Sequence, residues 1–89
     1  MSDLTRGDII KLIAVSTVNL NLTGVDLTGV DLSHLDLSGA ILKSANLSGS
    51  DLRGTNFEKA NLEKANFHKA ALEGTNFTDA NLKYARGLK

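Results

Sequence analysis

The sequence predicts an all-β solenoid, a stack of bent coils wound around one shared apolar axis. Three observations lead to this fold class. Leu or Phe recurs at every fifth position, a small or aliphatic residue stands two positions before it, and Asn or Asp stands between them in eleven of thirteen units. The thirteen central residues are Leu22, Leu27, Leu32, Leu37, Leu42, Leu47, Leu52, Phe57, Leu62, Phe67, Leu72, Phe77 and Leu82.

A period of five residues excludes the common alternatives. On an α-helix the central residues would spiral around the axis, because a helix repeats about every 3.6 residues and a coiled coil needs a stripe of about 3.5. On a flat strand they would alternate between the two faces, because five is odd. The chain therefore has to bend once in every unit, and each unit presents two inward side chains from one short extended segment.

The repeated unit resembles that of a known family. Val25-Asp26-Leu27-Thr28-Gly29 and Ala60-Asn61-Leu62-Glu63-Lys64 are similar to the A(D/N)LXX unit of pentapeptide-repeat proteins, and the resemblance extends from residue 20 to about residue 86. It implies a right-handed quadrilateral β-helix with four units in each coil. Central residues one coil apart would then stack in columns. Successive residues within a column would lie about 4.8 Å apart, the spacing of hydrogen-bonded strands. One such column would hold Leu37, Phe57 and Phe77.

The polar positions of each unit are expected to form its corner. Asn or Asp side chains can accept hydrogen bonds from nearby backbone groups, and Ile41 and Ala71 are the two exceptions at this position. In six units glycine falls two residues after the central residue, where it suits the positive φ of a type II turn. Because Lys59, Lys64 and Lys69 take that place elsewhere, we expect those three corners to use another turn type.

A capping helix is expected at the N-terminal end. The helix would span residues 5–16 and begin at Thr5, with Asp8 three residues later as a weak capping box. Its apolar face would cover the edge of the first coil, which needs such protection. That face is expected to contain Ile9, Ile10, Ile13 and Ala14.

No comparable helix follows Leu82. The five-residue register fails at Gly87, which stands where Leu or Phe is expected. We therefore expect the last coil to contact another molecule, with self-association as one such case, or to belong to a longer array. The predicted organisation is a cap over residues 1–18, the β-helix over residues 19–86 and a tail over residues 87–89.

Composition narrows the classes of function. Ten basic and ten acidic residues balance, so neither the basic surplus of a nucleic-acid-binding domain nor the strong acidity of a DNA mimic is present. Without cysteine, neither a disulfide nor a cysteine zinc site is expected. No segment is apolar enough for membrane insertion and no export signal is recognised, so we expect an intracellular, cytoplasmic location.

No residue pattern indicates catalysis. His34 and His68 fall on outward positions in different columns, and no third metal ligand converges with either of them. Ser and Asp recur because the repeat supplies them, so their presence does not indicate a catalytic triad. We predict a non-enzymatic chain with no catalytic, cofactor-binding or metal site.

One outward column carries the predicted protein-binding residues. Lys43, Glu63 and Lys83 would follow each other on adjacent turns of the solenoid, with opposite charges facing each other. Lys64 would lie under Tyr84 in a cation–π contact. Two interpretations remain: a solvated, self-paired surface, or a face that binds a partner through Lys43, Glu63, Lys83 and Tyr84.

The sequence favours a protein-interaction scaffold, because a prism without a pocket suits recognition of another protein better than chemistry. Residues 25–37, which follow a short helix, are also similar to the pentapeptide-repeat region after the BTB domain of eukaryotic BTB-linked proteins. That group includes a plant formin-homology-interacting protein. This resemblance implies the recognition half of a longer adaptor, serving a cullin ubiquitin ligase or the actin machinery. The alternative is a DNA-mimic inhibitor or protector of a topoisomerase such as gyrase.

Overall fold

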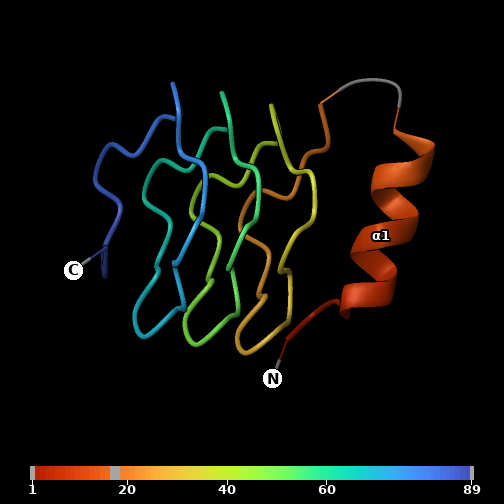
Figure 1. Cartoon of the computed structure of the whole chain (residues 1–89), viewed down its shortest axis with the longest axis horizontal. Coiled ribbons are helices and arrows are strands. Elements are labelled where there is room, and N and C mark those ends of the chain that lie inside the picture. The colour runs from red at the N-terminus through yellow and green to blue at the C-terminus, as the bar shows by residue number, and fades with distance from the viewer. Residues whose placement is uncertain (1, 17–18, 89) are drawn as a thin grey trace.

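The computed structural model describes residues 2–16 and 19–88 and shows a stack of coils with one helix at its end (Figure 1). The helix is α1 (Arg6–Val15). The β structure in the described residues consists of isolated parallel bridges, which join residues twenty apart, from Asn21↔Ile41 to Asn66↔Arg86. Four five-residue units therefore complete one coil, and the predicted all-β solenoid is confirmed. Each coil forms one rung of the stack, and residues twenty apart lie on neighbouring rungs.

The central residues form the apolar core of the stack. From Leu27 to Phe67 each of them is at most 2% exposed, whereas Leu72, Phe77 and Leu82 in the last coil are only partly buried. The rings of Phe57 and Phe77 stack with their centroids 5.8 Å apart and their planes 8° from parallel. Residues one coil apart therefore pack directly on each other inside the solenoid.

Every corner uses the same left-handed backbone conformation. In all thirteen units the residue two after the central one has φ between 58° and 73°. The next N–H donates to the carbonyl of the central residue, as from Val25 to Leu22 at 3.1 Å. The closing bond and the positive φ at the third residue are features of a type II turn.

The prediction of a different turn at three lysine corners is therefore wrong. Lys59, Lys64 and Lys69 have φ of 60°, 62° and 61°. The left-handed region costs a non-glycine residue roughly 1–2 kcal/mol. Bridges on both sides of each corner determine where the chain must turn, so the geometry of the coil overrides the local preference of lysine.

Asn and Asp side chains hold the same corners from the outside, as predicted. In all eleven units the side-chain oxygen accepts a hydrogen bond from the backbone N–H two residues later, at 2.9–3.1 Å. Ile41 and Ala71 cannot make this bond. The N–H groups of Lys43 and Glu73 accordingly have no acceptor among the residues that the structure describes.

The N-terminal helix is confirmed, with a complete capping box. The Asp8 N–H donates to Thr5 Oγ1 at 3.1 Å, and the Thr5 N–H donates to Asp8 Oδ2 at 3.0 Å. These two bonds satisfy N–H groups that have no partner inside the helix. The helix therefore begins where the sequence indicated.

The buried face of α1 differs from the predicted one. Ile9 is fully buried, and Leu12 and Ile13 pack partly against the core, but Ile10 is 43% exposed and Ala14 is exposed. Positions 9, 12 and 13 share one face at the spacing i, i+3 and i+4. Ile10 and Ala14 were wrongly placed on that face, because each lies about 100° around the helix from Ile9 or Ile13.

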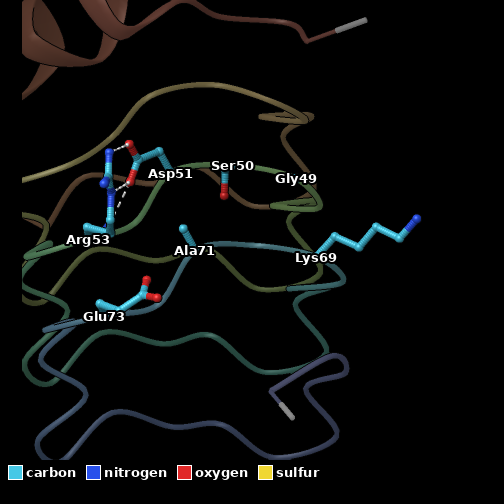
Figure 2. A pocket seen from close by; sticks show the side chains of 7 residues that line it. All are labelled: Gly49, Ser50, Asp51, Arg53, Lys69, Ala71 and Glu73. Carbon is cyan, nitrogen blue, oxygen red and sulfur yellow. Dashed lines mark hydrogen bonds and ion pairs between the residues drawn. The ribbon is translucent and has the colours of Figure 1, made fainter.

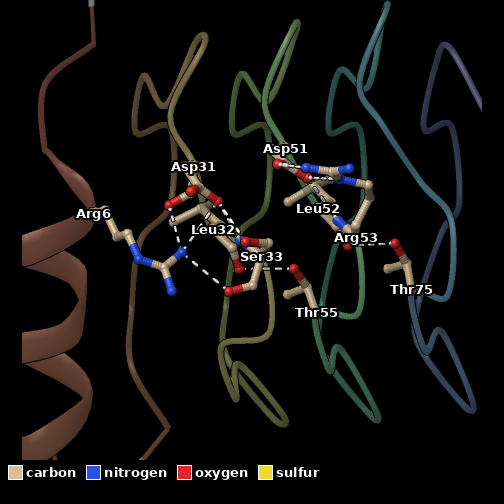
Figure 3. Close-up of polar contacts among 9 residues, drawn as sticks. All are labelled: Arg6, Asp31, Leu32, Ser33, Asp51, Leu52, Arg53, Thr55 and Thr75. Atoms are coloured by element: carbon tan, nitrogen blue, oxygen red, sulfur yellow. Dashed lines mark hydrogen bonds and ion pairs between the residues drawn. The ribbon is translucent and has the colours of Figure 1, made fainter.

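Arg6 ties α1 to the first coil (Figure 3). Its Nη1 donates to the carbonyl oxygens of Asp31 and Ser33, both at 3.0 Å, and to Asp31 Oδ1 at 3.2 Å. The Asp3 N–H donates to the Asp26 carbonyl at 2.7 Å, and the Asp3 carboxylate accepts from the Asp26 N–H at 3.0 Å. The cap therefore satisfies backbone groups that the first coil has no earlier coil to pair with.

The register ends at Gly87, whose backbone conformation only glycine fits. A Cβ on Gly87 would lie 2.5 Å from the backbone nitrogen of His68, so no side chain fits there, and its φ of 78° suits glycine. The last bridge joins Asn66 to Arg86. Two predicted boundaries involve residues outside the described ones. The cap is predicted to end at residue 18 and the tail at residue 89, and neither residue is described.

We predict that Lys64→Gly stabilises the protein by about 1 kcal/mol. Glycine avoids the strain of the left-handed corner, and part of that gain is offset by the greater freedom of glycine in the unfolded chain. Urea unfolding measures the change. Lys43→Gly is the matched control, because Lys43 is exposed on the same side but lies outside the left-handed positions. A loss of stability in Lys64→Gly would contradict the strain argument.

We also predict that Arg6→Ala lowers the free energy of unfolding by about 1–2 kcal/mol, because three oxygens of the first coil lose a charged donor. Thermal unfolding followed by circular dichroism reports the change. Lys11→Ala on the same helix is the control, since Lys11 is exposed. Equal effects of the two substitutions would show that Arg6 does not anchor the cap.

Candidate binding surface

One side of the solenoid gathers the residues predicted to bind a partner. Backbone hydrogen bonds place them on neighbouring rungs: the Lys64 N–H donates to the Lys83 carbonyl at 2.9 Å, and the Ser44 N–H to the Glu63 carbonyl at 2.8 Å. The lysines and the tyrosine are exposed, whereas Glu63 is half-buried. We call this set the lysine face, which consists of Lys43, Glu63, Lys64, Lys83 and Tyr84.

The lysine face carries a surplus of positive charge. Three lysines and one glutamate leave a net charge of two on this side. The predicted pairing of Glu63 with Lys43 and Lys83 is wrong, because the ion pairs of the described residues join only Arg6 to Asp31 and Arg53 to Asp51. The ammonium groups of the face therefore remain available to an external acid.

Tyr84 makes a cation–π contact, but not with the lysine predicted. Lys83 Nζ lies 5.3 Å from the centre of the Tyr84 ring, and this contact replaces the one predicted with Lys64. Lys83 precedes Tyr84 on the same rung and so reaches the ring more readily than a side chain one rung away. Tyr84 is 65% exposed, so the aromatic surface of the face is open to a partner.

A second feature, not predicted from the sequence, lies two five-residue units away along the coil and therefore on the opposite side. Ala71 stands where eleven of the other twelve units have Asn or Asp. A shallow hollow of about 580 Å³ lies over it. The signal was present in the sequence as a break in the Asn or Asp column. We call this hollow the Ala71 notch, and it is lined by Gly49, Ser50, Asp51, Arg53, Lys69, Ala71 and Glu73.

Of the two carboxylates at the notch, Asp51 is paired with a cation among the described residues and Glu73 is not. Arg53 donates to both carboxylate oxygens of Asp51, from Nε to Oδ1 at 2.9 Å and from Nη2 to Oδ2 at 2.7 Å. These bonds from the Arg53 side chain are the main cause that lowers the pKa of Asp51 to about 2. Lys69 extends away from the notch (Figure 2). Among the described residues Glu73 has no ion-pair partner.

The two histidines lie on the surface and apart from each other. His34 and His68 are both exposed, and the His34 ring covers Gly54 on the next rung, where a Cβ would lie 2.4 Å from His34 Nδ1. No group of three or more residues able to hold a metal ion occurs in the described part of the chain. The only helix there, α1, is too short to cross a membrane.

Comparison with protein families matches the repeat itself. The family model for pentapeptide repeats matches eight copies, over residues 11–43, 21–58, 40–79 and 60–86. The chain belongs to the pentapeptide-repeat family. Members of this family fold as right-handed quadrilateral β-helices and are generally non-enzymatic. A search of curated proteins found no match.

Several solved pentapeptide-repeat structures are similar to this chain. A protein from the Arabidopsis thaliana thylakoid lumen shares 35% identity over 74% of this chain and 46% of its own length, with a TM-score of 0.73. Proteins from Nostoc Pcc 7120 and Cyanothece 51142 share 27% and 37% identity. Their matches cover 91% and 74% of this chain and 74% and 55% of theirs, with TM-scores of 0.40 and 0.37. This chain thus spans about half the length of the lumen protein.

The lowered pKa of Asp51 predicts how acid affects this pentapeptide-repeat coil. A carboxylate whose pKa falls from 3.8 to about 2 on folding stabilises the folded state above pH 4, and that contribution is lost as the pH falls toward 2. Asp51→Asn retains an oxygen for the corner bond but loses the ionic pair with Arg53. Its stability should therefore change less between pH 4 and pH 2, as measured by urea unfolding.

Arg53→Gln is the companion variant, because it removes the partner and leaves the carboxylate. It should also flatten the acid dependence. A slope identical to that of the parent protein in both variants would contradict the assignment of this pH range to the pair.

Proposed function

We propose that this chain is a non-catalytic protein-interaction scaffold whose lysine face binds an acidic segment of a partner protein. The observation that carries the proposal is the surplus of two positive charges with no ion pair to Glu63. Each lysine also stands in a unit whose turn is closed by a backbone hydrogen bond, and the carbonyls of Lys43 and Lys83 accept from the preceding rung. Binding would therefore order only flexible side chains, which reduces its entropic cost.

The spacing of the lysine face favours an extended partner. Lys43 and Lys83 lie two rungs apart, about 10 Å at the usual distance between hydrogen-bonded strands. An extended peptide advances about 3.3 Å per residue and alternates its side chains, so acids at every second residue share one face at about 7 Å, a spacing that the flexible lysine side chains can meet. Lys64 lies between them at the corner, and the open ring of Tyr84 adds apolar contact area.

The proposal extends to the setting of the scaffold. The resemblance of residues 25–37 to the repeat region of BTB-linked proteins supports a role as the recognition part of a larger adaptor. The partner would then be a formin-homology protein of the actin machinery or a protein presented to a cullin ubiquitin ligase. Of these, a purified formin-homology domain is the direct binding target to test.

The lysine face is tested by charge reversal. The combined variant Lys43→Glu, Lys64→Glu and Lys83→Glu should weaken binding of a fluorescent peptide with glutamates at every second residue by tenfold or more, because opposed charges become like charges. Fluorescence anisotropy at low ionic strength measures the affinity, and added salt should weaken it in the parent protein. The formin-homology domain is then titrated with the same variants.

The control variant carries the same change in net charge elsewhere. Lys11→Glu, Lys59→Glu and Lys69→Glu lie outside the lysine face, and Lys59 and Lys69 share the left-handed corner position of Lys64. Affinity should stay within about threefold of the parent, a change of less than 1 kcal/mol. An equal loss in both variants, or no binding by the parent, would overturn the proposal.

A further inference from the structure

The coil farthest from α1 has an open backbone edge (Figure 1). In earlier coils the N–H of each central residue donates to the next rung, and the carbonyl two residues before it accepts from that rung, as in Phe57 and Thr55. In the last coil these groups have no backbone partner among the described residues. The N–H groups belong to Leu72, Phe77 and Leu82, and the carbonyls to Ala70, Thr75 and Ala80.

The same end of the stack exposes part of the apolar core. Leu72, Phe77 and Leu82 are only partly buried, whereas the central residues one rung earlier are fully buried. The Phe77 ring stacks on Phe57 at 5.8 Å and meets the edge of Phe67 at 5.7 Å, both on its inner side. Unpaired ladder groups around exposed apolar side chains form a template for pairing with another chain.

The open edge is complementary to itself. Two last coils that meet end to end about a two-fold axis run in opposite directions, so their strands pair antiparallel. In such a pair, the carbonyl and the N–H that flank an outward residue exchange hydrogen bonds with the equivalent two groups opposite. The Thr75 carbonyl and the Phe77 N–H flank Asn76 in this way. The edge therefore offers donors and acceptors in the order that a second copy needs.

We propose that the last coil binds the last coil of a second copy of this chain and forms a two-fold symmetric dimer. The first coil of another copy cannot take this place, because α1 covers it and Arg6 and Asp3 bond to its backbone. The chain measures 28 by 23 Å across its two shorter axes. An end face of that size approaches the roughly 800 Å² that each partner buries in a stable interface.

The rise of the coil selects one register for the dimer. Each unit lies slightly farther along the stack than the unit before it, because four units complete one rung. Two such ends lie flush only when the first unit of one coil faces the last unit of the other. The unit of Phe77 then faces the unit of Leu82 in the second copy, and the two-fold axis passes the corner of Thr78 and Asp79.

This register determines which charges meet. The corner of Glu73 faces the corner of Lys83 in the other copy, so opposite charges lie across the interface. Asp79 lies beside the axis and faces the Asp79 of the other copy. Within the described part of the chain Asp79 has no ion-pair partner that would offset this repulsion. Removing the charge of Asp79 should therefore strengthen the dimer, whereas removing that of Glu73 should not.

Sedimentation velocity through the micromolar range tests the dimer and its register. The parent protein should approach twice the mass of one chain. Asp79→Asn should tighten the dimer several-fold and keep the corner, where φ is 58°, because Asn tolerates the left-handed conformation. Glu73→Gln should leave the affinity unchanged or weaken it. A parent protein that stays monomeric, or equal tightening by both variants, would overturn the proposal.

Amide hydrogen exchange locates the interface in the parent protein without any substitution. The amides of Leu72, Phe77 and Leu82 should exchange about tenfold or more slowly at high than at low protein concentration, because the second copy supplies their acceptors. The amide of Lys43 has no acceptor among the described residues and lies on a side of the solenoid, so it should stay fast. Association without this protection would show that another surface pairs and would contradict the proposal.

Leu82→Lys blocks the open end. In the monomer the lysine can extend its ammonium group past the last coil, but in the dimer that charge would be buried without a partner. Association should weaken tenfold or more. Ile10→Lys is the matched control, since Ile10 is 43% exposed on α1 at the other end, and it should leave the dimer unchanged. The opposite pattern would refute the assignment. No acidic peptide is present, so this proposal and the proposed function fail independently.

Discussion

The structure depends on one constraint: every five-residue unit has a left-handed backbone corner closed by a hydrogen bond. All thirteen corners have it, including seven where a side chain other than glycine carries the strain. The corner turns the chain by a constant amount, so residues twenty apart come to lie on neighbouring rungs. The core columns, the Asn and Asp corners and the lysine face follow from that register.

The two ends of the ladder are chemically different because the rungs are parallel. The first coil presents carbonyl groups, which Arg6 and Asp3 partly satisfy from the cap. At the other end the N–H groups of Leu72 and Phe77 have no backbone acceptor among the described residues, and the central side chains there are only partly buried. The ladder therefore has a direction: among the described residues the first coil presents more carbonyl groups than N–H groups to its outer side, and the last coil presents the reverse.

Most of the fold could be predicted from the sequence, because a period of five is incompatible with regular helices and strands and every unit repeats the same evidence. The turn at Lys64 could not, since local preference argues against a left-handed lysine and only the closed coil imposes it. The placement of Ile10 failed because apolar residues on a short helix outnumber those that its buried face can hold.

The candidate surfaces were less predictable than the fold. The residues of the lysine face followed from the twenty-residue register, but which lysine contacts the Tyr84 ring depends on side-chain conformation, which the repeat leaves free. The notch was visible only as the exception at Ala71.

The coil of twenty residues also determines which side chains share one side of the solenoid. Inserting or deleting one five-residue unit between the notch and Tyr84 would rotate everything beyond it by a quarter turn, moving a residue to the adjacent side without disturbing the apolar axis. A change of twenty residues would restore every alignment and alter only length. Relatives that differ by whole coils can therefore preserve the same outward pattern, whereas those that differ by single units can present new combinations of side chains on an unchanged framework.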